Sequence, residues 1–125
     1  SHHSPQDQDS KRLPFEQAEF GIIGFETLFP ISLDLHINGK MKLIKLIDKL
    51  TNQPAKLLNL NAGKIAINSP ADLTLIDINT SNILNLENMN SKSNNSLFDE
   101  YEAKGKILCT VVDGRIVYSD QKFNL

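Results

Sequence analysis

The segment KILCTVVDGRIVYS, residues 106–119, decides the fold of the second half of the chain. Its two apolar runs flank Asp113-Gly114, and this dipeptide between two such runs predicts a β-hairpin with a two-residue type I′ turn. Upstream, GKIAI (63–67) and ADLTLIDIN (71–79) indicate further strands, and NILNL (82–86) is a weaker candidate. The sequence therefore predicts antiparallel strands from residue 63 onward, interrupted by a long polar loop over 87–105.

A helical period replaces this pattern before residue 63. Apolar positions over 27–37, followed by Asn38-Gly39, predict a helix there. KLIKLIDKL (42–50) has the stripe of an amphipathic helix, and TNQPAKLLNL (51–60) predicts a further turn or two beginning near Pro54. Because no strand alternates with these helices, we expect them to pack on polypeptide missing from this chain.

The composition excludes several classes of protein. A chain of 125 residues forms one domain at most, and 40% hydrophobic with 22% charged residues is typical of a globular protein. The net charge of −2 predicts no nucleic-acid partner and no anionic membrane surface. No apolar run reaches a membrane span, and no signal peptide is visible. The single Cys109 excludes an internal disulfide and favours a reducing, cytoplasmic location.

Several longer segments carry a resemblance to one enzyme family. SHHSPQDQDSKRLPFEQAEFGIIGFETLFP (1–30) resembles the segment after the last barrel strand of dihydroorotases. Their usual pattern is Asp-His-Ala-Pro-His, a polar stretch with Lys and Pro-Phe, then Phe-Gly-Ile-x-Gly-x-Glu-Thr. TNQPAKLLNL resembles the family's Asn-Pro-Ala helix, GKIAINSPADLTLID (63–77) its Pro-Ala-Asp-Leu strand pair, and residues 91–118 its closing segment. FGIIGFET (20–27) and SKSNNSLF (91–98) point to dihydroorotase more narrowly than PADL and DGRIVY, which occur across cyclic amidohydrolases.

The resemblance implies an α/β fold, the carboxy-terminal part of a (β/α)8 (TIM) barrel amidohydrolase. Residues 1–62 would be the end of the metal-dependent hydrolase barrel, with its last catalytic loop and helices. Residues 63–125 would form antiparallel strands of a small β-sandwich and the closing hairpin. Such enzymes reversibly convert N-carbamoyl-L-aspartate to dihydroorotate in de novo pyrimidine biosynthesis with zinc. The zinc ligands are expected upstream of Ser1, so the 125-residue chain alone, whether a proteolytic fragment or a truncated product, is expected to be inactive. The intact protein is expected to be a homodimer.

The first six residues depart from the family's catalytic motif. When the two are aligned on Pro5, His3 matches the first histidine of the motif. His2 stands where the family has its catalytic aspartate, and Ser4 stands where it has alanine. Gln6 replaces the second histidine, which binds the substrate in the family. The aspartate takes a proton from the attacking water and returns it to the leaving nitrogen. His2 is therefore the candidate catalytic residue, although its imidazole is longer and becomes cationic on accepting the proton. A purification-tag remnant is the alternative explanation, but residues 4–18 continue the family's pattern without a break.

The resemblance also implies substrate-binding residues. Gln6 can donate to and accept from a substrate carboxylate or amide, although a solvated loop glutamine is the simple alternative. The backbone at Phe20 and Gly21 presents groups to the substrate in the family, and a glycine permits close approach. A tight turn before the helix is the alternative there. Asp7 or Asp9 would be either a displaced carboxylate or solvated loop residues.

Two other functions follow from the same sequence. The replacements at His2 and Gln6 suit a non-catalytic dihydroorotase-like subunit that scaffolds aspartate transcarbamoylase. A dihydropyrimidinase, hydantoinase or allantoinase type of cyclic amidohydrolase is the other alternative.

The remaining polar residues have structural interpretations. We expect His36 to contact carbonyls at a helix end and Cys109 to lie in the core. Asp72 should form hydrogen bonds at the start of a strand. The long loop should be held in place by Lys92, Ser93 and Asn94.

Overall fold

The computed structural model describes residues 1–120. Its elements, in chain order, are α1 (Gln8–Lys11), α2 (Leu28–Ile37), α3 (Leu43–Leu50), α4 (Asn52–Leu57), β1 (Leu73–Ile83), the 3₁₀ turn η1 (Leu86–Asn88), β2 (Glu102–Val112) and β3 (Arg115–Ser119). Helices come first and strands follow, as the sequence predicts. The predicted helices over 27–37, 42–50 and near Pro54 are confirmed. The expected domain boundary after residue 62 falls between α4 and β1 and stays a prediction.

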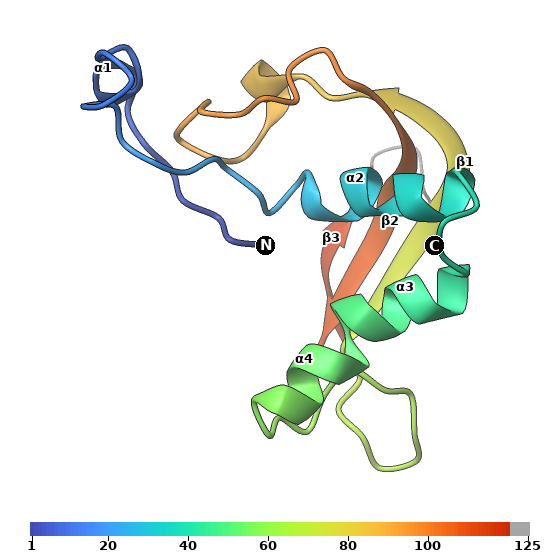
Figure 1. The fold of residues 1–125 in the computed structure, drawn as a ribbon. Coiled ribbons are helices and arrows are strands. Elements are labelled where there is room, and N and C mark those ends of the chain that lie inside the picture. Colours follow the sequence, from blue (N-terminus) through green and yellow to red (C-terminus); the bar gives the residue numbers. More distant parts are fainter. Residues whose placement is uncertain (121–125) are drawn as a thin grey trace.

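The strands form one antiparallel sheet in the order β1-β2-β3 (Figure 1). Asp113 and Gly114 connect β2 to β3 with φ of +48° and +75°, and a type I′ turn requires positive φ at both positions. The Asp113 N–H donates to Asp72 Oδ1 (2.8 Å), so Asp72 ties the start of β1 to the hairpin. The predicted hairpin and the structural role of Asp72 are both confirmed.

Two strand predictions are wrong in whole or in part. Residues 63–67 form no strand, and the side chains of Ile65 and Ile67 are 91% and 94% exposed. Asn68, at φ +62°, turns the chain directly afterwards. In NILNL, Asn82 and Ile83 end β1, but the chain then bends into η1. Among the described residues, no strand lies beside residues 63–67, whereas Asn82 and Ile83 pair with Ala103 and Glu102 of β2 before the chain turns.

Helix α2 packs on strand β2, which corrects the expectation that the helices pack only on missing polypeptide (Figure 1). Leu33 of α2 is fully buried. Gly105 of β2 makes this approach possible, because a Cβ there would lie 2.7 Å from Leu33 Cδ2 and 2.9 Å from Phe29 Cε1. Close helix–sheet packing therefore depends on the absence of a side chain at Gly105.

The other helices are only partly covered. Leu46 of α3 is buried, whereas Ile44 on the same helix is 74% exposed and Leu57 of α4 is also exposed. The core is small, and its apolar members are Ile23, Leu33, Leu46, Ala55, Leu84, Leu86, Ala103 and Cys109. Cys109 therefore lies in the core, as the sequence predicts. Among residues 1–120, no helix has the length and apolar character of a membrane span.

Candidate functional site

The motif-bearing segment at the start of the chain runs parallel to the segment that precedes α2. His3 and Ile22 form a parallel β-bridge, and the Ser4 N–H donates to the Ile22 carbonyl (2.8 Å). The Gly24 N–H donates to His3 Nδ1 at 3.1 Å, so this ring nitrogen acts as an acceptor. These bonds fix the backbone of residues 3–4 against residues 22–24.

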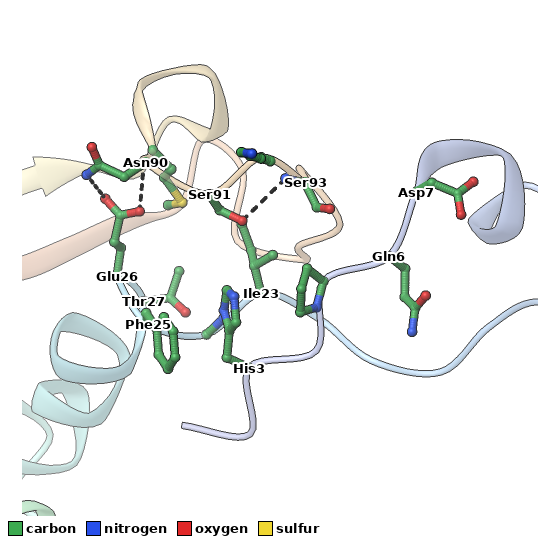
Figure 2. Close-up of a pocket in the computed structure, with 14 residues that line it drawn as sticks. His3, Gln6, Asp7, Ile23, Phe25, Glu26, Thr27, Asn90, Ser91 and Ser93 are labelled. Atoms are coloured by element: carbon green, nitrogen blue, oxygen red, sulfur yellow. Dashed lines mark hydrogen bonds between the residues drawn. The ribbon is translucent and has the colours of Figure 1, made fainter.

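The His3 ring is held by an aromatic contact as well. Its plane lies 5° from that of Phe25, with ring centroids 4.0 Å apart, and Figure 2 shows the two rings face to face. The hydrogen bond at Nδ1 and this stack together fix the ring's position and orientation. Nε2 is left as the imidazole nitrogen that can act on a bound molecule.

Gly21 is required by the close approach of the two segments. A Cβ at Gly21 would lie 2.5 Å from both Cβ and Oγ of Ser4. The residue also has φ +114°, which L-amino acids rarely adopt. A turn before the helix does not by itself explain this glycine, because Ser4 packs directly against it.

An open pocket of about 710 Å³ lies beside His3 (Figure 2). One wall comes from residues 23–27 and the opposite wall from residues 89–93 of the loop between η1 and β2. Glu26 joins the two walls, because its carboxylate accepts from the Asn90 N–H (2.8 Å) and from Asn90 Nδ2 (3.2 Å). The long loop therefore forms part of the candidate site.

The four predicted site residues take different positions. Gln6 Nε2 donates to the Phe20 carbonyl (3.1 Å), so the structure brings these two together, and Gly21 follows Phe20 directly. The Phe20 side chain is 87% exposed. His2 is exposed and has φ +52°. Of the four, Gln6 lines the pocket beside His3, and in Figure 2 its side chain lies away from the His3–Phe25 stack.

Asp7 serves as a helix cap. Its Oδ1 accepts from the Ser10 N–H at 2.9 Å, at the start of α1. Hydrogen bonds from Ser10 hold the pKa of Asp7 below its usual value. A displaced catalytic carboxylate at Asp7 would have to give up this cap, and the neighbouring Asp9 is exposed within α1.

The other structural interpretations have different outcomes. His36 Nδ1 lies 3.2 Å from the Met41 carbonyl, just beyond the end of α2, as expected for a histidine at a helix terminus. The Ser93 N–H donates to Ser91 Oγ (3.3 Å), a hydrogen bond within the loop itself. The loop is instead attached to the rest of the molecule by Asn90, described above, and by Asn95.

Asn95 and Lys11 are the residues that sequence reasoning missed. Asn95 Oδ1 accepts from the Gln6 N–H (3.0 Å), and its Nδ2 donates to the carbonyls of Ser4 (2.9 Å) and Gly21 (3.1 Å). Lys11 Nζ donates to the carbonyls of Glu19 (2.7 Å) and Gly21 (3.3 Å). The SKSNNSLF segment drew attention to this loop, but nothing local distinguishes Asn95 from Asn94.

The described residues do not by themselves fit a zinc site. Over residues 1–120, no group of three or more His, Cys, Asp or Glu side chains is arranged to hold a metal ion. His3 Nδ1 is already engaged by Gly24. Structural and catalytic zinc sites use at least three protein ligands.

Comparison with known proteins defines the class. The model of the Amidohydrolase family matches residues 18–117, and the chain belongs to this family. It is 44% identical over 119 residues to a dihydroorotase of Wolbachia sp. subsp. Drosophila simulans, covering 95% of this chain and 27% of that protein. A dihydroorotase of Ehrlichia chaffeensis is 41% identical over 116 residues, covering 93% of this chain and 26% of that protein. The resemblance to dihydroorotases is confirmed, and the chain spans about a quarter of the length of these relatives.

Solved structures of related enzymes share the fold. A D-hydantoinase (dihydropyrimidinase) from Thermus sp. superposes with a TM-score of 0.85 at 23% identity, over 98% of this chain and 28% of that one. An L-hydantoinase (dihydropyrimidinase) from Arthrobacter aurescens superposes with a TM-score of 0.78 at 26% identity, over 88% of this chain and 25% of that one. The arrangement of helices and sheet is therefore that of a segment of cyclic-amide hydrolases.

Proposed function

We propose that this chain is part of a dihydroorotase that converts N-carbamoyl-L-aspartate reversibly to dihydroorotate in de novo pyrimidine biosynthesis. The observation that carries the proposal is the 36–44% identity to curated dihydroorotases over nearly the whole chain. The family model covers residues 18–117, which include Phe20, Gly21 and Asn95.

The proposal includes a barrel origin for the helical half. Ile44 and Leu57 expose apolar side chains on α3 and α4, and such surface is normally covered. The chain spans only about a quarter of its relatives, so the rest of a (β/α)8 barrel would supply that cover. The zinc ligands are proposed to lie in that remainder, and the enzyme is proposed to act in the cytoplasm as a homodimer.

Within this chain, Gln6, Phe20 and Gly21 would bind the substrate. The Gly21 carbonyl already accepts bonds from Lys11 and Asn95, which leaves its N–H as the group that can face a substrate oxygen. Gln6 uses Nε2 on the Phe20 carbonyl, which leaves Oε1 to accept from a substrate N–H. His2 would exchange the proton between water and the leaving nitrogen, and its exposed position leaves it accessible.

The experiment is dihydroorotate turnover by the intact protein, purified alone and supplied with zinc. We expect turnover by the wild type and a loss of about 10²–10⁴ in kcat for His2→Ala. His2→Asp, which restores a carboxylate, should remain active. Absence of turnover in the folded wild type and in His2→Asp would reject the proposal. Hydantoin, dihydrouracil and allantoin are the competing rings, and preference for one of them would assign another cyclic amidohydrolase.

A non-catalytic role is the second candidate. It is favoured by the absence of an aspartate at His2 and by the use of Asp7 as a helix cap. In this role the protein would scaffold aspartate transcarbamoylase. Turnover by His2→Asp but not by the wild type, together with co-sedimentation of the wild type with aspartate transcarbamoylase, would favour it.

A further inference from the structure

Asn95 engages two distant segments through one side-chain amide. Its Oδ1 accepts from the Gln6 N–H, and its Nδ2 donates to the carbonyls of Ser4 and Gly21. The Asn95 backbone carbonyl accepts in addition from the Ile23 N–H (3.0 Å). All four partners are backbone atoms, so these contacts determine main-chain position whatever side chains stand there.

The set of partners requires an amide of this length. Two carbonyl oxygens need two donors, and one N–H needs an acceptor, which a carboxamide supplies from a single planar group. An aspartate would replace Nδ2 by one acceptor oxygen facing the carbonyls of Ser4 and Gly21, and would lose both donors. An alanine would remove the side-chain partner of the Gln6 N–H and of the Ser4 carbonyl, and would leave the Gly21 carbonyl with Lys11 Nζ (3.3 Å). The partners also fix which end of the amide carries oxygen.

The groups that Asn95 holds are the proposed substrate-binding groups or their direct neighbours. Gln6, bonded to Asn95 through its N–H, bonds in turn to the Phe20 carbonyl. Gly21, bonded to Asn95 through its carbonyl, is itself one of the proposed substrate-binding residues. The long loop that carries Asn95 reaches the N-terminal segment from the strand half of the molecule (Figure 1).

We propose that Asn95 is a positioning residue, which sets the separation of Gln6 from Phe20 and Gly21 by holding residues 4–6 against residues 20–23. The expected change in the kinetic constants rests on the proposed function, whereas the expected change in main-chain position does not. Gln6, Phe20 and Gly21 are proposed to bind the substrate and not to react with it, so their displacement should raise KM more than it lowers kcat. Oδ1 and Nδ2 of Asn95 are both engaged by main-chain groups, so we assign Asn95 no contact with the substrate.

The kinetic test compares Asn95→Asp with Asn94→Asp in the intact protein with zinc. Asn94 is the exposed neighbour, so Asn94→Asp adds the same charge but keeps the hydrogen bonds of the Asn95 side chain. We expect Asn95→Asp to raise KM for dihydroorotate roughly tenfold to a hundredfold, with a smaller change in kcat. Asn94→Asp should match the wild type. Equal kinetic constants for the two variants would overturn the proposal. If Asn95→Asp does not fold, Asn95→Ala gives the same comparison without a new charge.

Residue-resolved hydrogen exchange tests the hydrogen bonds of the Asn95 side chain without reference to activity. In Asn95→Ala, the Gln6 N–H loses its acceptor and should exchange faster, whereas the Ile23 N–H keeps the Asn95 backbone carbonyl and should exchange as in the wild type. Faster exchange at both would show general loosening of the loop and would overturn the proposal, as would unchanged exchange at Gln6. If the wild type lacks turnover, but the Gln6 N–H and not the Ile23 N–H loses protection in Asn95→Ala, then the proposed function is wrong and the positioning role of Asn95 is confirmed.

Discussion

The imidazole of His3 lies flat against the ring of Phe25, with 4.0 Å between the ring centroids. Phe25→Leu keeps an apolar side chain but removes the aromatic face. We expect a loss of about 0.5 kcal/mol in unfolding free energy, since both rings are partly exposed. The His3 ring protons should also lose the ring-current shift that the stack gives them in the NMR spectrum. Phe15→Leu is the control, because Phe15 is exposed; an equal change in the His3 signals there would contradict the prediction.

Gly21→Ala should destabilise the protein more than Gly39→Ala. Both glycines have positive φ, +114° and +68°, but a Cβ at Gly39 meets no atom within 4 Å, whereas at Gly21 it meets Ser4. Gly39→Ala should cost roughly 1–2 kcal/mol for its backbone conformation alone. Gly21→Ala adds the collision with Ser4 to a strain of order 1–3 kcal/mol. Urea denaturation measures both, and equal losses would show that Ser4 simply moves aside.

Leu33→Ala should loosen α2 from the sheet. Leu33 is fully buried beside Gly105, and removing a buried leucine side chain costs about 2–5 kcal/mol. Leu35→Ala, on the same helix but 43% exposed, should cost about 1 kcal/mol or less. Thermal or urea unfolding of the two variants measures the difference. Similar losses would mean that α2 is not held by this contact.

The bond between Tyr101 and Asp34 should make stability depend on alkaline pH. The Tyr101 hydroxyl donates to Asp34 Oδ2 (2.7 Å), and this bond, with the charge of Asp34, raises the pKa of Tyr101 above its usual 10.0. Folding therefore favours the neutral phenol, so the contribution is complete below pH 10.0 and disappears as pH rises through the raised pKa. Tyr101→Phe should be less stable than the wild type at neutral pH and lose that deficit at high pH. Tyr118→Phe is the control, and a deficit independent of pH would contradict the prediction.

Local patterns predicted most elements of the fold. The apolar segment over residues 27–37 with Asn38-Gly39 after it, the stripe of α3 and the Asp113-Gly114 turn are each local signals, and each has its expected structure. The segment 63–67 shows the limit of this reasoning. Its alternation suits a strand, but a strand also needs a partner, and none of the described residues pairs with it.

The candidate site was predictable in its segments but not in its contacts. The family resemblance directed attention to residues 2–6 and 20–21, which the structure places side by side. Asn95 meets Gln6 and Ser4 across 89 and 91 positions of sequence. An asparagine in an asparagine-rich polar loop has no pattern that reveals such a contact. Its importance depends on the tertiary fold alone.

The separation between Ser4 and Asn95 has a consequence for biosynthesis. At about 5–20 residues per second, the ribosome makes Asn95 roughly 5–18 seconds after Ser4, since 91 positions separate them. The β2–β3 hairpin closes through two residues, whereas this contact requires closing a long loop, which carries a larger entropic cost. The hydrogen bonds from Asn95 to Ser4 and Gln6 can therefore form only after the strand half has been synthesised, whereas the bond from the Ser4 N–H to Ile22 can form earlier. We expect residues 4–6 to be more open to proteases in the nascent chain before Asn95 is synthesised than after it.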